Sequence, residues 1–345
     1  MQNKNRISPA AVIAAGLILS ILTIVVCSGT GSVDISPWDI VRIVASKISG
    51  SPLPSDIEPN MSSIIWSVRI PRVLCAFFAG GILSVCGCVM QSLLQNPLAS
   101  TYTLGVSSGA SLGAAIAMVV SGTLAISGLF LLPFSGFVAA LLTVILVMLL
   151  SERMGKGLRS TTVILTGMVL SLFMNALLML IETLFADEFR HVIMWQMGSF
   201  NGKRGIHVLF LMTACIVGTV VISLFHREMD VMTFGDDESS VTGVDTMKVK
   251  RMLIALSSLF TGMTVCFTGT IGFVDLITPH VVRKFTGPAH KYLIPVSMLA
   301  GGVFMALADT IGRTVIAPRE IPVGAVTALI GAPFFIWIYL KRNEY

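Results

Sequence analysis

The chain has 345 residues, of which 54% are hydrophobic and only 12% are charged, and its mean hydropathy is +0.88. Soluble domains carry about 25% charged residues, and a soluble fold of this length needs far more polar surface. The composition therefore excludes a soluble globular enzyme, a disordered chain and a secreted disulfide scaffold, and it indicates an integral membrane protein with a formal net charge of +5.

The length of the apolar runs decides which kind of membrane protein this is. A membrane helix needs about 20 residues, whereas a tilted barrel strand needs about 10. Runs such as 10–27 and 124–150 are long and do not alternate with period two as barrel strands do. The expected fold is all-α, a single polytopic transmembrane domain over residues 1–345. We predict about ten spans, at 9–28, 66–90, 103–121, 124–150, 161–182, 206–226, 252–270, 274–285, 293–311 and 321–340.

Two of these spans need comment. Residues 1–27 could form a cleaved signal peptide, but Val26 stands before Cys27 where lipoprotein processing needs a small side chain, and no A-x-A site follows. We therefore interpret this stretch as the first membrane helix. The eighth span is short and contains Pro279, so we expect that it does not cross the membrane as a simple straight helix.

The distribution of Lys and Arg predicts the orientation. An even number of spans places both termini on one side, and basic residues are more frequent on that side than on the other. The positive-inside rule then places both termini in the cytoplasm, with the protein in the bacterial plasma membrane and in contact with its lipid. Residues 29–65 become an outer loop with a short helix around 38–46, and residues 226–251 become the largest inner segment.

Sites for catalysis are missing from the sequence. No Gly-x-x-x-x-Gly-Lys-Ser/Thr loop is present, the five histidines are scattered, and no nucleophile–base arrangement can be recognised. The six cysteines lie inside or at the edge of apolar runs, where they are small packing residues. We expect a protein that is not an enzyme and has no cofactor, no metal site and no nucleic-acid partner.

Polar residues at the membrane edge and inside spans are the remaining clues. Asn96, Pro97 and Leu98 combine a helix breaker with a polar side chain between the second and third spans, as in a re-entrant turn or a gate. Asp275, Asp309 and Arg313 are charges in or near spans, each costing about 2.5–3.5 kcal/mol at a helix centre unless it is paired or hydrated. Asp309 and Arg313 are four residues apart and therefore share a helix face.

Arginines also gather at the predicted outer end of the second span. Arg69 and Arg72 flank Pro71, and they are either anchors that reach for the interface or, with Arg313, a basic patch that binds carboxylates. On the inner side, Gly235 to Val244 begins with acidic residues and is punctuated by glycine. That segment is either a solvated loop or a docking surface for a cytoplasmic partner.

Together these segments resemble the permease subunits of bacterial ABC importers for iron–siderophore complexes, haem and vitamin B12, the FecCD-type family of type II importers. The resemblance covers nearly the whole chain. It rests on the following blocks, which occur in this order: Arg69-Ile70-Pro71-Arg72, Met90-Gln91 with Asn96-Pro97-Leu98-Ala99, Leu104 to Ala110, Gly235 to Val244, Gly272 to His280, Ala308-Asp309-Thr310, Ile321-Pro322-Val323-Gly324 and Gly331-Ala332-Pro333-Phe334.

The resemblance implies a passive pathway formed by two permease subunits, identical or different, driven by two cytoplasmic ATPases and supplied by an extracellular solute-binding protein. It implies the following roles: Asn96, Pro97 and Leu98 as an inner gate turn, Ser160 and Thr161 as a second gate position, Arg69, Arg72 and Arg313 as partners of binding-protein glutamates, and Gly235, Asp236, Asp237, Glu238 and Gly243 as part of the ATPase coupling helices. Thr242 and Asp275 depart from the family pattern, which often has an apolar residue and a glycine there.

Two other functions stay open at this point. An ion-driven secondary transporter would use Asp309 or Asp275 as a proton relay and would need no partner. A membrane scaffold or assembly factor would move no solute. The sequence does not identify the cargo, which in this family is a ferric siderophore, haem or cobalamin.

Overall fold

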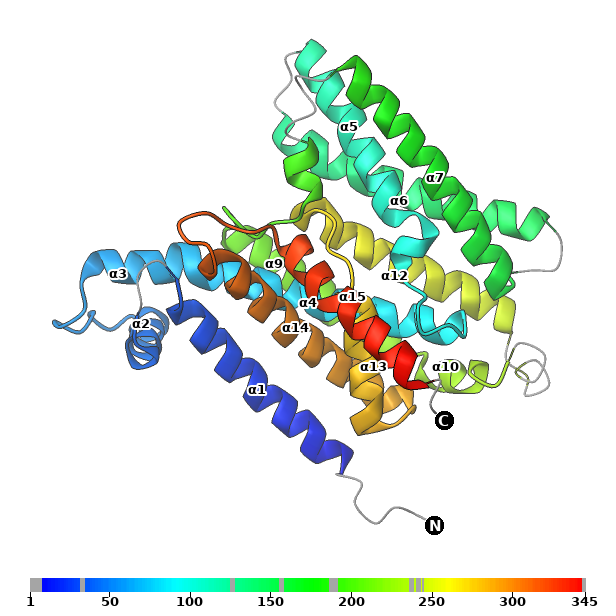
Figure 1. Cartoon of the computed structure of the whole chain (residues 1–345). Coiled ribbons are helices and arrows are strands. Elements are labelled where there is room, and N and C mark those ends of the chain that lie inside the picture. The colour runs from blue at the N-terminus through cyan, green and yellow to red at the C-terminus, as the bar shows by residue number, and fades with distance from the viewer. Residues whose placement is uncertain are drawn as a thin grey trace.

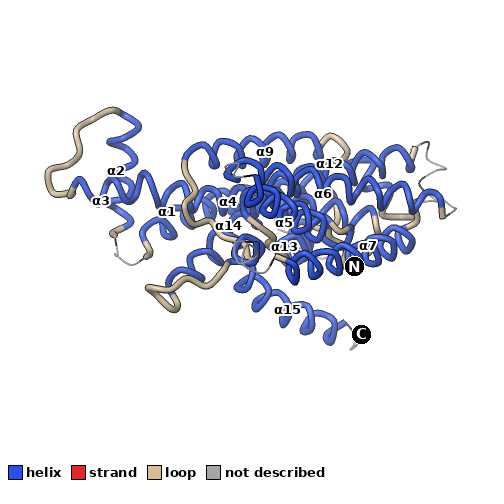
Figure 2. Tube along the Cα trace, turned by 90° about the horizontal axis from the view of Figure 1, so that it is seen from above, coloured by secondary structure: helices blue, strands red, loops and turns tan. Residues whose placement is uncertain are grey.

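The computed structural model describes residues 8–31, 35–124, 128–154, 158–185, 192–235, 239, 243 and 245–342, and this part of the chain is helical (Figures 1 and 2). In chain order its longer helices are α1 (Pro9–Gly29), α2 (Pro37–Ser49), α3 (Pro59–Ile64), α4 (Ile70–Leu93), α5 (Val106–Leu124), α6 (Gly128–Arg153), α7 (Ser160–Leu184), α9 (Gly205–Ser223), α10 (His226–Met232), α12 (Thr246–Thr268), α13 (Val274–Thr286), α14 (His290–Thr314) and α15 (Val323–Arg342). A π-helical turn, Ile65–Arg69, joins α3 to α4, and a 3₁₀ turn, Thr101–Leu104, precedes α5.

The predicted spans correspond to α1, α4, α5, α6, α7, α9, α12, α13, α14 and α15. In the described part of the chain, seven helical segments are long and apolar enough to cross a membrane, and α5 and α15 contain the shorter apolar stretches Val106–Ser121 and Val323–Ile338. With 13 residues, α13 is about 20 Å long and too short to cross a hydrocarbon core of about 30 Å. The first residue of α1 and the last of α15 lie toward the same side of the molecule (Figure 1).

The helix α4 forms the centre of the bundle. It packs against α14, α9, α13 and α12, and nearly all of its residues are buried. Gly80 of α4 and Gly301 of α14 lie so close that a Cβ atom on either residue would clash with the backbone carbonyl of the other. Small residues at a crossing let two membrane helices approach to backbone contact. This contact fixes α4 against α14 and makes the pair a rigid core.

The remaining helices surround this core. α5, α6 and α7 pack against one another, and they lie together at the top of Figure 1. α7 is apolar on its outward face, where large side chains such as Leu165, Val169 and Leu172 are exposed. Such a surface is stable against lipid hydrocarbon or a second protein surface, but not against water.

The loop between α1 and α4 is an ordered structure of its own. The short helix expected around 38–46 is confirmed as α2, which starts at a Ser36 cap followed by Pro37 and ends at Gly50 with φ 69°. Arg42 donates to both carboxylate oxygens of Asp56, at 2.6 and 2.7 Å. This hydrogen bonding lowers the pKa of the Asp56 carboxyl, and it joins α2 to the segment that leads into α3.

Candidate functional site: an arginine network and two gate segments

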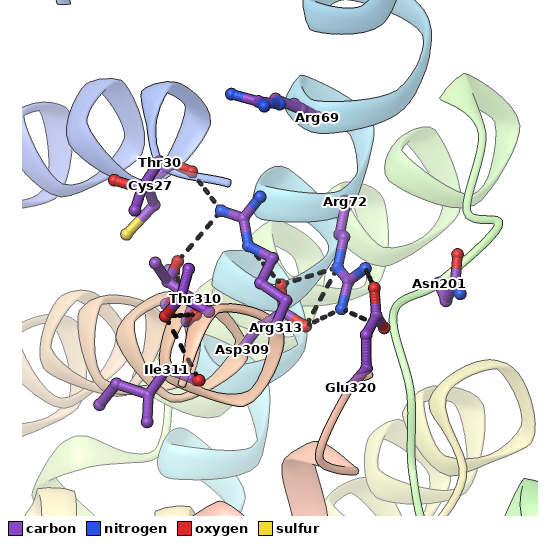
Figure 3. A network of polar contacts seen from close by, with 12 residues as sticks. Cys27, Thr30, Arg69, Arg72, Asn201, Asp309, Thr310, Ile311, Arg313 and Glu320 are labelled. Carbon is purple, nitrogen blue, oxygen red and sulfur yellow. Dashed lines mark hydrogen bonds and ion pairs between the residues drawn. The ribbon is translucent and has the colours of Figure 1, made fainter. Parts of the chain in front are cut away.

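Arg72, in the first turn of α4, is the centre of an ion-pair network at that end of the helix (Figure 3). Its Nε and Nη2 lie 2.9 Å from Oδ2 and Oδ1 of Asp309 in α14. Its Nη1 and Nη2 donate to Oε1 and Oε2 of Glu320 at 2.8 and 3.0 Å. One guanidinium thus binds two carboxylates in the planar, two-pronged geometry that arginine favours. The Asp309 side chain is only 3% exposed and that of Glu320 is 37% exposed.

Two further arginines in the same region hold the end of α1. Arg69 donates from Nη1 to the carbonyl oxygens of Gly29 at 2.6 Å and Ser28 at 3.3 Å. Arg313 donates from Nη2 to the carbonyl of Cys27 and to Thr310 Oγ1, and its Nε lies 3.9 Å from Asp309 Oδ2. The last carbonyls of a helix have no partner within the helix and carry partial negative charge. These arginines therefore cap α1 and tie it to α4 and α14.

Arg69, Arg72 and Arg313, which the sequence suggested as interfacial anchors or as a docking patch, lie in one region of the structure, but their guanidinium groups are turned inward. Arg69 is 6% exposed, and the side chain of Arg72 is 11% exposed. They are buried because carbonyls and carboxylates of neighbouring helices satisfy them. Asp309 pairs mainly with Arg72, 237 residues away, and only loosely with Arg313 on its own helix. Glu320 was missed, because it has no partner near it in the sequence.

At the other end of α4, residues 95–99 form a compact turn, called the gate turn below. Gln95 has φ 47°, and the backbone N–H of Asn96 donates to the Gln91 carbonyl at 3.2 Å. The Asn96 side chain accepts from the Leu98 N–H at 2.9 Å, which is an Asx turn closed through Pro97. Leu98 is 48% exposed. The turn is therefore fixed by its own hydrogen bonds and presents an apolar side chain at its tip.

The segment 226–251, called the coupling segment below, is hydrogen-bonded to the gate turn and, through His290 of α14, is connected to the end of α4. Gln95 donates from Nε2 to the carbonyl of Met232 in α10 at 3.0 Å. Asp230 Oδ1 accepts from the backbone N–H of His290 at 2.9 Å and lies 2.6 Å from its Nδ1. The other ring nitrogen of His290 lies 2.6 Å from Ser92 Oγ in α4. A movement of α10 therefore acts on the gate turn directly and on α4 through a buried histidine.

The far end of the coupling segment is bonded to a residue just before the second predicted gate position. Ser160 is the first residue of α7, and Thr161 follows it with an exposed side chain. Lys250, which is 2% exposed, donates from Nζ to the carbonyl of Leu158 at 3.2 Å, two residues before Ser160. Arg251 also binds Glu152 of α6 at 2.7 Å. The coupling segment thus bonds a residue beside each predicted gate position, Gln95 near one of its ends and Leu158 at the other.

Part of the predicted coupling site is described. Gly235 and Gly243 have φ 119° and 86°, a region that favours glycine. Asp236, Asp237, Glu238 and Thr242 lie outside the described residues. The described residues contain no group of three His, Cys, Asp or Glu side chains that could hold a metal ion. All six cysteines are buried and unbridged, consistent with packing residues.

Comparisons with known proteins agree on one family. A model of the FecCD transport family matches residues 17–341. An uncharacterized ABC transporter permease protein of Bacillus subtilis, YvrB, is 36% identical over 323 residues, covering 94% of this chain and 91% of the relative. The cobalamin import system permease protein BtuC of Halobacterium salinarum is 34% identical, covering 89% and 80%. The hemin transport system permease protein HmuU of Yersinia pestis is also 34% identical, covering 81% and 84%.

A solved structure described as an inward-facing conformation of a metal-chelate type ABC transporter has the same fold. It shares 29% sequence identity with this chain, with a TM-score of 0.82 over 96% of this chain and 99% of the other. The relatives are permease subunits, which are not catalytic, since separate subunits hydrolyse ATP. On these grounds the chain belongs to the FecCD transport family of ABC transporter permeases and has the type II importer permease fold.

Proposed function

We propose that this chain is the transmembrane permease subunit of an ATP-driven importer for an iron chelate, a ferric siderophore or haem, or for cobalamin. Two such subunits, identical or different, form the pathway with two cytoplasmic ATPases and an external solute-binding protein. The whole chain forms a single membrane domain with both termini in the cytoplasm. The main support is that the coupling segment is hydrogen-bonded at one end to the gate turn, through Gln95, and at the other to Leu158 beside the second gate position.

The mechanism follows from these contacts. ATP binding closes the two ATPases, and the closure displaces the coupling segment as a rigid body. Since Met232 is bonded to Gln95 and Asp230 to His290, α10 cannot move without pulling on the gate turn and on the end of α4. The same movement pulls on the segment before Ser160 through Lys250. The subunit forms the pathway and transmits the movement, and the partner ATPases supply the free energy.

Reconstituted vesicles test this function. The chain, with the ATPase and binding-protein subunits encoded beside it, is assayed for ATP-dependent uptake of a radiolabelled ferric hydroxamate, haem and cyanocobalamin. Gln95→Ala should leave ATP hydrolysis intact but reduce uptake per ATP several-fold. Thr233→Ala is the control, because Thr233 follows Met232 in the coupling segment, is exposed, and its hydroxyl donates only to the nearby Asp230 carbonyl. Reversing Asp236 and Asp237 to Lys should uncouple hydrolysis from uptake completely.

The proposal has clear contrary results. Solute uptake by the purified chain alone along an ion gradient would establish a secondary transporter instead. An ATPase-active complex that moves none of the three probes would point to a scaffold. Equal uptake per ATP in the wild type and in Gln95→Ala would show that the Gln95–Met232 hydrogen bond does not transmit the movement of α10. It would not affect the assignment of the chain to its family.

The arginine network supports a second part of the proposal, docking of the binding protein. Glutamates of that protein would bind Arg72 by competing with Glu320, the more exposed of its two carboxylate partners. Glu320→Gln should therefore strengthen docking, whereas Arg72→Gln should weaken it, with both measured as the affinity of the binding protein for nanodisc-embedded complex. If both variants bind like the wild type, docking does not use this network.

A further inference from the structure

The cavity that adjoins the gate turn contains a carboxylate that the proposed function does not use. Asp275, the second residue of α13, is completely buried and is one of the residues that line a cavity of about 260 Å³ between the 3₁₀ turn and the loop that precedes α13. Hydroxyl groups dominate the polar part of its lining. They belong to Ser100, Tyr102, Thr103, Ser107 and Thr270.

Four of these five hydroxyl groups already donate their only proton to other protein atoms. Their acceptors are Asp275 Oδ2 for Ser100, the Ile271 carbonyl at 3.0 Å for Tyr102, the Ser100 carbonyl at 2.6 Å for Thr103 and the Gln196 carbonyl at 2.6 Å for Thr270. What these groups still present is therefore lone pairs. The second carboxylate oxygen, Asp275 Oδ1, is buried and has no hydrogen-bond partner. The polar groups of the lining therefore have free acceptor lone pairs but few free donor protons.

The charge of Asp275 is also unbalanced within the protein. None of the ion pairs of the described residues involves Asp275. An ionised carboxylate in a low-dielectric interior needs a counter-charge, and intramembrane charges of this kind mark functional sites. An ionised Asp275 would therefore need a cation as its partner.

We propose that this cavity binds a monovalent cationic group, with Asp275 Oδ1 as its charged ligand and neighbouring hydroxyl oxygens as neutral ligands. Carboxylate and hydroxyl oxygens suit hard cations, and a single carboxylate balances a single positive charge. The group is either a free alkali ion or an ammonium group on the transported solute. The site itself depends only on the cavity, whereas the second source rests on the proposed function.

Occupancy of the site would act on the gate. Ser100 directly follows the gate turn, and Asp275 lies in the first turn of α13. Gln91 of α4 holds that turn by donating to the carbonyls of Asp275 and Leu276 at 3.3 and 3.1 Å. A cation bound between Ser100 and Asp275 would connect the gate turn to α13 and, through Gln91, to α4. Its release frees the turn to move with the coupling segment.

Binding to the purified chain in nanodiscs tests the proposal without any transport step. The midpoint of thermal unfolding is measured in choline chloride and again with sodium, potassium or methylammonium chloride replacing choline at constant ionic strength. Direct binding of ²²Na⁺ and ⁸⁶Rb⁺ is measured in parallel. We expect one of these cations to raise the midpoint saturably, and we expect the rise to vanish in Asp275→Asn and in Asp275→Gly. Asp39→Asn, which alters a carboxylate in α2, is the matched control and should respond like the wild type.

Each result decides the question. A response to an alkali ion identifies a free ion as the ligand, and a response to methylammonium alone identifies the ammonium group of a solute. No saturable binding of any cation to the wild type would overturn the proposal, even if both Asp275 variants fail to fold. Unchanged binding in either folded Asp275 variant would also overturn it. The binding assay contains no transport step, and the uptake assay in vesicles measures no cation binding, so the cation site and the proposed function can fail or stand separately.

Discussion

Removing Arg72 is the sharpest test of how the bundle is held together. Arg72→Met keeps most of the side-chain volume but leaves Asp309, whose side chain is 3% exposed, with only the 3.9 Å contact to Arg313. Breaking a buried ion pair by removing one partner costs about 3–5 kcal/mol, because a desolvated charge stays behind. Glu320 is 37% exposed, and its loss of Arg72 adds no more than about 1 kcal/mol.

These energies translate into a measurable shift in thermal stability. An unfolding entropy of roughly 2.1 cal/mol/K per residue gives about 0.7 kcal/mol/K for a chain of this length, so a loss of about 3–5 kcal/mol lowers the unfolding midpoint by about 4–7 °C. Helices that persist in the membrane reduce this entropy, so the shift is at least of this size. A thiol-reactive fluorophore suits the assay, because all six cysteines are buried and become reactive only on unfolding.

Two further variants separate the buried pair from the exposed one. Glu320→Gln should lower the midpoint by less than about 2 °C. In the double variant Arg72→Met/Asp309→Leu no unpaired carboxylate stays buried, so we expect at least half of the lost stability to return. An unchanged midpoint in Arg72→Met, or a double variant no more stable than the single one, would refute the view that the Asp309 charge makes Arg72 essential.

Three more predictions concern other parts of the chain. Gly80→Ala should prevent correct packing of α4 on α14 and abolish monodisperse expression, whereas Gly205→Ala, with open space around the new methyl group, should express normally; equal yields would contradict the close crossing. Because Arg42 lowers the pKa of Asp56, this pair contributes stability above the carboxyl's unfolded pKa of about 3.9 that is lost as pH falls through the lower folded value. The protection of α2 against hydrogen exchange, expressed relative to the intrinsic exchange rate at each pH, should therefore fall in that acidic range, and in Asp56→Asn it should already be low above that range. Leu98→Asp should place a charge at the tip of the gate turn and lower uptake several-fold without changing ATP hydrolysis, and uptake at the wild-type rate would show that this tip lies off the pathway.

Most of the helices could be predicted from the sequence because burial in lipid leaves a long apolar run for most spans. The observed helix bounds differ from the predicted span bounds where a helix continues beyond its apolar run into polar residues. Thus α12 begins at Thr246 rather than 252, because Asp245 caps it and accepts from the Lys248 N–H. The short α13 was also expected, since 13 residues with a proline cannot cross the membrane alone.

The contacts of the candidate site could not be predicted in the same way. The bonds between the coupling segment and the residues beside the two proposed gate positions use the backbone carbonyls of Met232 and Leu158, and every residue carries such a group, so no residue type marks them. The inward turn of Arg72 depends on Asp309, which lies 237 residues away. Sequence patterns identify groups that need a partner, and only the packing of α4 against α14 decides which partner each one meets.

The position of α4 joins the two ends of the proposed mechanism. Its 24 residues span about 36 Å, with Arg72 in the first turn and Gln91 and Ser92 in the last. It is buried along nearly its whole length and locked to α14 at Gly80 and Gly301, so a force on one end moves the helix as a unit. If docking at the arginine network and closure of the coupling segment both bias the position of α4, each must change the equilibrium of the other by the same factor. Binding-protein affinity should therefore depend on the nucleotide state of the ATPases, and replacing Gln95 should weaken that dependence without touching the docking surface.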